Sequence, residues 1–177
     1  MHPWQEPQPC YTGIAPTDFK REVIATPKTN WELVEQYYIE PLRAMKRHEA
    51  FVCLSICFPL YEKLLRKALN IHDDEKFSQG HRVFNSIGKN WQISAEQAYQ
   101  FWSHWRNGLL HRGMPKASDN FKTWLTPEGN QGIVVNKEGH ISLNPWVFRD
   151  VLLKLLESNK GIWKDEDFPL LQEVREI

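Results

Sequence analysis

The stretch from residue 42 to residue 69 carries an apolar side chain at nearly every third or fourth position. The pattern runs through Phe51, Leu54, Phe58, Tyr61, Leu65 and Ala68. This spacing places the apolar side chains on one face of an α-helix, which must be buried against other elements. We therefore expect a long helix from Leu42 to Leu69, kinked at Pro59, inside a helical domain.

Signals for helix ends mark the elements on either side of this long helix. Thr29 and Glu32 form a capping box that predicts the start of a first helix, which Pro41 should end. A shorter helix is expected over residues 77–87. Ser94 and Gln97 form a second capping box, and Asn144-Pro145 should open a last helix over 146–157.

Residues 132–143 depart from the helical pattern. Two short runs of β-branched and aliphatic residues flank the turn sequence Asn136-Lys-Glu-Gly139, which predicts a β-hairpin. The expected fold class is therefore mainly α, with four to five helices and a small hairpin before the last long helix. We divide the chain into a Pro-rich arm (1–28), a helical domain (29–160, with the hairpin at about 132–143) and an acidic tail (161–177).

The overall charge is balanced, with 22 basic and 22 acidic residues, which argues against a protein whose whole surface grips nucleic acid. A local basic run remains between residues 42 and 69, and the sign reverses after residue 157. Arg43, Lys46 and Arg47 are the candidates in this run for holding RNA electrostatically. The alternative is that the run forms an ordinary solvated helix face.

Three cysteines, Cys10, Cys53 and Cys57, are too few to suggest a disulfide framework, so a reducing compartment is the simpler inference. Cys53 and Cys57 lie within an apolar run, where free cysteine behaves as a small buried hydrophobe. No cluster has convincing metal-ligand spacing, and we expect neither a metal nor another cofactor. The sequence shows no membrane span or secretion signal pattern, so we expect a cytoplasmic protein.

Arginine followed by histidine after four to six intervening residues occurs three times: Arg43 to His48, Arg66 to His72, and Arg106 to His111. The third pair differs from the others in its context. Asn107 follows the arginine, two leucines precede the histidine, and Gly113 and Pro115 end the segment. It also follows tryptophans at helical spacing, which predicts a buried helix.

The segment from Trp102 to Pro115 resembles the motif of the HEPN (higher eukaryotes and prokaryotes nucleotide-binding) superfamily. The resemblance covers residues 30 to 157. It implies a helical bundle, a two-fold homodimer and, in many members, a metal-independent endoribonuclease that acts as a toxin or in phage defence. Other members are catalytically silent and bind a nucleotide or a partner protein, so RNA, a nucleotide, an antitoxin or another regulatory protein are the expected partners.

The residue types of this motif fit RNA cleavage without a metal. Histidine can move protons near neutral pH, which makes His111 the candidate general base or acid. Arg106 is the candidate cation for charge developing on phosphorus, and Asn107, four residues before His111, can orient the imidazole. Arg112 is a further candidate for contacting RNA. The structural alternative is a histidine and an arginine that merely face the negative end of a helix dipole.

Glu62, in the long helix, has two readings. It can hold Arg106 in place, as a supporting residue behind the catalytic group. It can also be a helical acid that pairs with Arg66, four residues later.

Overall fold

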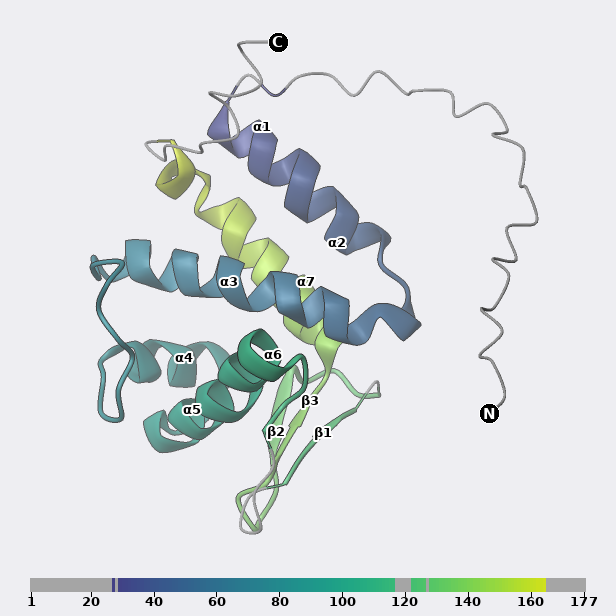
Figure 1. The fold of residues 1–177 in the computed structure, drawn as a ribbon, viewed down its shortest axis with the longest axis vertical. Helices are drawn as coiled ribbons and strands as arrows, with labels where there is room; N and C mark the ends of the chain where they lie inside the picture. The colour runs from purple at the N-terminus through teal and green to yellow at the C-terminus, as the bar shows by residue number, and fades with distance from the viewer. Residues whose placement is uncertain (1–26, 28, 117–121, 127, 165–177) are drawn as a thin grey trace, which may run out of the picture.

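The computed structural model describes residue 27 and residues 29–116, 122–126 and 128–164. These form a mainly helical fold with one small sheet (Figure 1). In chain order, the elements are α1 (Asn30–Val34), η1 (Glu35–Ile39), α2 (Glu40–Ala44), η2 (Arg47–Glu49), α3 (Ala50–Ala68), α4 (Val83–Trp91), α5 (Ala95–Phe101), η3 (Trp102–Arg106), α6 (Asn107–Arg112), β1 (Thr123–Leu125), β2 (Ile133–Val135), β3 (Ile141–Leu143), α7 (Pro145–Ser158) and η4 (Lys160–Trp163). All but one residue of the predicted N-terminal arm, and residues 165–177 of the predicted tail, lie outside the described residues.

The first helix is continuous from α1 through η1 to α2. It begins at Thr29, whose hydroxyl accepts a hydrogen bond from the backbone N–H of Glu32 at 3.1 Å, which is the Thr29 half of the predicted capping box. The prediction that Pro41 ends this helix is wrong. The π-helical turn η1 precedes the proline, and its wider ring of hydrogen bonds lets the chain continue past a residue without an N–H group.

The long helix starts later than predicted. Met45 has an extended backbone, with ψ of 138°, and Lys46 is also extended, so residues 42–44 belong to the first helix and α3 begins at Ala50. Pro59 lies inside α3 on its exposed side. Of the predicted apolar face of α3, Leu54, Phe58, Tyr61 and Leu65 are buried, whereas Phe51 is half-buried and Ala68 is exposed.

The helix predicted over residues 77–87 lies further along the chain, at α4. Gly80 has φ of +83°, which interrupts any helix through residue 80. The imidazole of His81 then accepts the backbone N–H of Val83 at 3.1 Å and marks the start of α4. Phe77 remains in the connecting loop, where it packs against Trp102.

The predicted hairpin is present as β2 and β3, which pair in antiparallel register with Val134 opposite Ser142. A third strand, β1, was not predicted. It pairs with β3 in parallel, so that the strand order is β1-β3-β2. Asn144 then caps α7, accepting the backbone N–H groups of Trp146 and Val147, as the Asn-Pro sequence predicted.

The core lies where α3 crosses α7 (Figure 1). Aromatic side chains from four helices meet there: Phe58, Tyr61, Trp91, Phe101, Trp102 and Phe148. Trp163 is also buried, so packing extends beyond residue 160 into the start of the predicted tail. No helix in the described part of the chain is both long enough and apolar enough to cross a membrane.

Candidate functional site

The motif segment belongs to one continuous helix made of α5, η3 and α6. It starts at the predicted capping box, where Ser94 and Gln97 exchange hydrogen bonds of 3.1 and 2.8 Å. The π-helical turn η3 ends at Arg106, and the backbone N–H of Asn107 bonds back to the carbonyl of Trp102. A π-helical turn holds one residue more than an α-helical turn, which rotates the side chains that follow it relative to the rest of the helix. Such turns are frequent at functional sites. Trp102, Trp105 and Leu109 are buried and fix this helix in the core.

After α6 the chain turns back over its own helix. Gly113 has φ of +70° and ends α6 in the left-handed conformation. Lys116 then forms two hydrogen bonds with His104, both at 2.9 Å. Its backbone N–H donates to the carbonyl of His104, and its own carbonyl accepts from Nδ1 of the His104 ring. This returning segment passes so close to Gly108 that no side chain fits there. A Cβ on Gly108 would lie 2.6 to 2.8 Å from backbone atoms of residues 114–116.

We predict that Gly108→Ala destabilises the protein by about 1 to 3 kcal/mol, because backbone must move to admit the methyl group. Alanine's better helix propensity, worth about 1 kcal/mol, offsets only part of this cost. Urea unfolding measures the change. Gly161→Ala is the matched control, since a Cβ there meets nothing within 4 Å. Equal stability of the two variants would contradict the close packing at Gly108.

Glu62 joins two arginines. Its Oε2 accepts a hydrogen bond from Nε of Arg106 at 2.9 Å and forms an ion pair with Nη2 of the same guanidinium at 2.6 Å. Its Oε1 accepts from Nε and Nη2 of Arg66, at 3.1 and 2.8 Å. Glu62 therefore contacts both of the arginines that the sequence offered as its partners, although it is not an exposed helical acid. The carboxylate is only 13% exposed, so it depends on these two cations to compensate for the water that it has lost.

Arg106 makes one further hydrogen bond, from Nη1 to the side-chain oxygen of Asn107 at 3.0 Å. Its guanidinium also lies over the Trp102 ring, 5.9 Å from the ring centroid. Arg106 is thus held in a fixed orientation by groups from α3 and from its own helix. This orientation turns its side chain toward the same cleft as Asn107 and His111.

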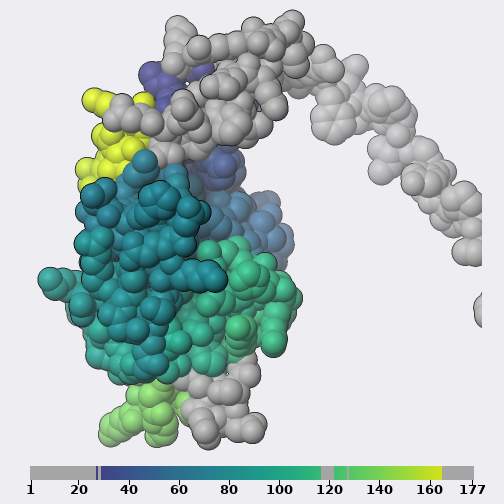
Figure 2. All heavy atoms as spheres, turned by 60° about the vertical axis from the view of Figure 1, so that its left-hand side comes forward, coloured from purple at the N-terminus to yellow at the C-terminus, as the bar shows by residue number. Residues whose placement is uncertain are grey.

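The cleft has a volume of about 450 Å³. In Figure 2 the surface of the end of α3 and the following loop, in blue-teal, adjoins that of the α6 segment, in green. One wall carries Glu62, Arg66 and the loop from Asp73 to Phe77; the other carries Trp102, Arg106, Asn107, His111 and Lys116. The three predicted residues Arg106, Asn107 and His111 therefore face one cavity of a size that admits a nucleotide.

His111 is the exposed member of this group. No hydrogen bond or ion pair of its side chain is found among the described residues. Its imidazole is therefore available to a ligand in the cleft, whereas the imidazoles of His81 and His104 both bind protein groups. His111 lies in the last turn of α6, so the structural alternative of a histidine facing the negative end of the helix dipole also stays open.

The charges that line the cleft cancel. Four acids, Glu62, Asp73, Asp74 and Glu75, face four bases, Arg66, Lys76, Arg106 and Lys116. A hydrogen bond with His81 lowers the pKa of Glu75, which keeps this acid ionised near neutral pH. The cleft by itself therefore does not attract a polyanion over a distance.

The other two arginine-histidine pairs have different surroundings. Arg66 donates Nη1 to the backbone carbonyls of His72 and Glu75, at 2.7 and 3.0 Å, so it holds the loop after α3. The His72 side chain is 80% exposed beside Asp74. Arg43 forms an ion pair with Glu157, on α7, and His48 is exposed.

The remaining candidates for contacting RNA are divided between two places. Arg112 is exposed at the end of α6, next to His111. Lys46 and Arg47 line a separate cavity of about 360 Å³ near the start of α7. Sequence reasoning missed Lys116 and Trp102 as cleft residues. Lys116 follows the helix end, so no periodic pattern reports its position.

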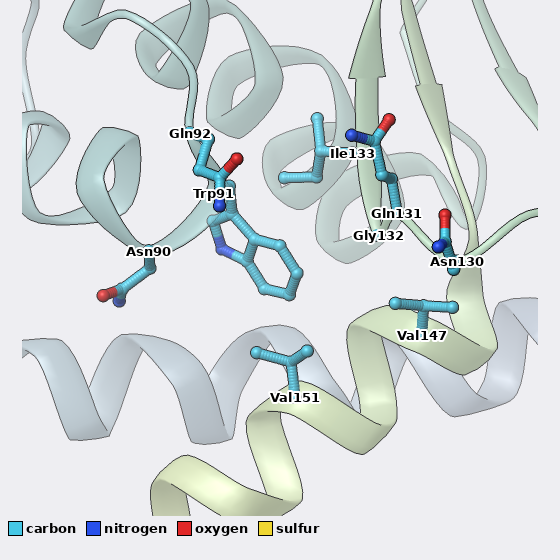
Figure 3. A pocket seen from close by; sticks show the side chains of 9 residues that line it. All are labelled: Asn90, Trp91, Gln92, Asn130, Gln131, Gly132, Ile133, Val147 and Val151. Atoms are coloured by element: carbon cyan, nitrogen blue, oxygen red, sulfur yellow. The ribbon is translucent and has the colours of Figure 1, made fainter.

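Two other features carry no catalytic groups. Cys53 and Cys57 are buried, with their sulfur atoms 3.9 Å apart, as expected for small apolar side chains in a core. A pocket of about 190 Å³ between α4, the loop before β2 and α7 is lined by Trp91, valines, an isoleucine and amide side chains (Figure 3). None of its lining residues titrates near neutral pH.

Among the described residues, no three His, Cys, Asp or Glu side chains are grouped closely enough to hold a metal ion. Comparison with models of protein families, with curated proteins and with solved structures finds no match for this chain.

Proposed function

We propose that this chain is a HEPN-type, metal-independent endoribonuclease that acts as a homodimer. The observation that carries the proposal is that Arg106, Asn107 and His111 line one cleft, with His111 exposed and Arg106 oriented by Glu62. A role as a toxin restrained by an antitoxin, or in phage defence, belongs to the same proposal and rests on the resemblance of the motif.

Cleavage requires two proton transfers. A base takes the proton of the ribose 2′-hydroxyl while the 2′ oxygen bonds to phosphorus. The bond from phosphorus to the 5′ oxygen then breaks, and an acid protonates that oxygen. The products are a 2′,3′-cyclic phosphate and a 5′-hydroxyl end. Arg106 stabilises the charge that develops on the phosphoryl oxygens.

Two histidines serve these transfers best, because one imidazole must be neutral and the other protonated. The cleft of one chain has one histidine, His111, among its lining residues. A two-fold dimer through α6 supplies the second. Leu110 and Met114, apolar residues that are 39% and 55% exposed, flank His111 and can be covered in such a dimer.

We predict a mass of two chains in light scattering at micromolar concentration. Leu110→Glu should shift the mass toward one chain, because a charge would be buried at the proposed interface. Val134→Glu, on the sheet, is the matched control, since Val134 is 38% exposed. A single-chain mass for the parent, or equal effects of both variants, would contradict the proposed dimer.

We predict that RNA cleavage proceeds in EDTA, since protein side chains perform both proton transfers and stabilise the charge. The test is to incubate RNA with the purified protein with and without EDTA and to identify the product ends. Cyclic phosphate ends in both samples support the proposal. Loss of cleavage in EDTA that a divalent ion restores would move the chemistry to a metal-dependent site.

The second candidate is a catalytically silent HEPN-like module that binds a nucleotide or a partner protein. One observation favours it: Nε and Nη2 of Arg106 bind Glu62, and Nη1 binds Asn107, so each nitrogen of the guanidinium already has an acceptor. Binding of a nucleotide without cleavage of any RNA tested would select this candidate.

A further inference from the structure

The cavity that contains Lys46 and Arg47 lies apart from the cleft. It is formed by the segment that joins α2 to α3 and by the start of α7. Its charged and aromatic lining residues are Lys46, Arg47, Trp146 and Arg149. Met45 and Val147 add an apolar wall against which a flat ring can pack.

This cavity is positively charged, in contrast to the cleft. Lys46, Arg47 and Arg149 line it, and no lining residue is acidic. Two acids adjoin it. Asp150 pairs with Arg149 at 2.8 Å, and Glu49 accepts the backbone N–H of Lys46. The side chains of Lys46 and Arg47 have no ion-pair partner within the described ranges, so two cations remain for an anionic ligand.

The cavity is also fixed in shape. Nη1 of Arg149 donates a hydrogen bond to the carbonyl of Leu42 at 3.2 Å, which ties α7 to the end of the first helix. The same guanidinium stacks over the Trp146 ring at 5.1 Å. The walls that support the two cations are therefore ordered before a ligand arrives, which lowers the entropic cost of binding.

The position of the cavity suggests the length of the ligand. Lys46 and Arg47 lie just before Ala50, where α3 begins, and Glu62 lies twelve residues further along that helix. At 1.5 Å per residue this is about 18 Å of helix. This separation exceeds the length of one nucleotide, so a ligand that contacts both places must be a strand of several nucleotides. Such a strand would have one phosphate near His111 and another in the positive cavity.

We propose that Lys46 and Arg47, supported by Arg149 and Trp146, form a second phosphate site that captures single-stranded RNA whose cleaved bond lies in the cleft. The choice of RNA as the ligand rests on the proposed function. The site supplies the long-range attraction that the charge-balanced cleft lacks. Contacts of this kind bind phosphate without reading bases, so the site should show little sequence preference.

The test is binding of a labelled 2′-O-methyl oligonucleotide, which has no free 2′-hydroxyl and cannot be cut. The full chain and the double variant Lys46→Ala/Arg47→Ala are compared by fluorescence anisotropy at several salt concentrations. The control is Lys137→Ala/Lys154→Ala, which removes two exposed lysines from the β-turn and from α7. For the first variant we expect about tenfold weaker binding, and a plot of log affinity against log salt concentration whose slope is shallower by about 1.4, which is about 0.7 for each of the two lost phosphate contacts. The control should bind within about twofold of the parent.

Equal losses in the two double variants, or no loss in either, would overturn the second site. The same holds if a phosphopeptide or an anionic vesicle binds in a Lys46- and Arg47-dependent way while the oligonucleotide does not. If the expected pattern appears but the parent cuts no RNA, the second site stands and the proposed activity fails. If His111-dependent cleavage is found with unchanged binding by the first variant, the activity stands and the second site fails.

Discussion

His111→Ala should abolish RNA cleavage and leave the fold unchanged. Loss of a group that transfers a proton typically lowers the rate about 100- to 10,000-fold. The imidazole is exposed and makes no hydrogen bond or ion pair with any described residue, so its removal should cost less than about 0.5 kcal/mol of stability. Initial rates on a labelled RNA, together with urea unfolding of each variant, measure both quantities.

His48→Ala and His72→Ala are the matched controls for this experiment. Both histidines are exposed, and each follows an arginine at a similar spacing. They lie outside the residues that line the cleft, so their variants should cut RNA within a few-fold of the parent. Full activity of folded His111→Ala, or loss of activity in His48→Ala alone, would show that the site has been chosen wrongly.

Arg106 should be replaced by a residue that keeps its positive charge, because Arg106 also has a structural role. Arg106→Lys keeps a positive charge near Glu62 but loses the planar fork that two oxygens can share. We expect its cleavage rate to fall toward that of His111→Ala with a smaller loss of stability than Arg106→Ala would cause.

Local signals in the sequence predicted the elements whose ends are defined by their own residues. The Ser94 capping box, the Asn144 cap of α7 and the hairpin of β2 and β3 all depend on side chains within a few positions of each other. Such contacts form in the same way whatever surrounds them. They are therefore the part of the fold that a single sequence reports well.

The errors have a different origin. Strand β1 has three residues and pairs with β3, about eighteen positions later, so no local pattern marks it. The first helix continues past Pro41 because a π-helical turn precedes the proline. This turn holds one residue more than an α-helical turn, so it shifts the apolar spacing by which the sequence would have indicated one continuous helix. In both cases tertiary packing decides between local alternatives.

The candidate site likewise has one part that local sequence spacing predicted and one part that depends on tertiary packing. Arg106, Asn107 and His111 are close in sequence, and their spacing on one helix predicted a shared site. The opposing wall, from Asp73 to Phe77, depends on how the loop after α3 folds back. Arg66 secures that fold through the carbonyls of His72 and Glu75, contacts that no periodicity can indicate. The balanced charge of the cleft could therefore not be predicted from the sequence.

The second large effect is expected at Glu62. Glu62→Ala should destabilise the protein by about 3 kcal/mol, because it leaves two largely buried guanidinium groups without their shared carboxylate. Arg66 and Arg106 are 11% and 23% exposed at their side chains, so water replaces the lost acceptor only in part. Urea unfolding measures the loss. Glu96→Ala is a suitable control, since Glu96 is an exposed helical acid whose hydrogen bonds are to glutamine amides.

Glu62→Gln separates the two roles of this residue. The amide keeps the shape and one acceptor oxygen, so its loss of stability should be smaller than that of Glu62→Ala. It can no longer neutralise both arginines, and Arg106 becomes free to turn toward phosphate or away from it. If Glu62 orients Arg106 for catalysis, Glu62→Gln lowers the cleavage rate more than it lowers RNA binding. If Glu62 instead withholds Arg106 from phosphate, as in the silent module, the same variant binds nucleotide more tightly than the parent. Unchanged stability of both Glu62 variants would contradict the shared ion pair itself.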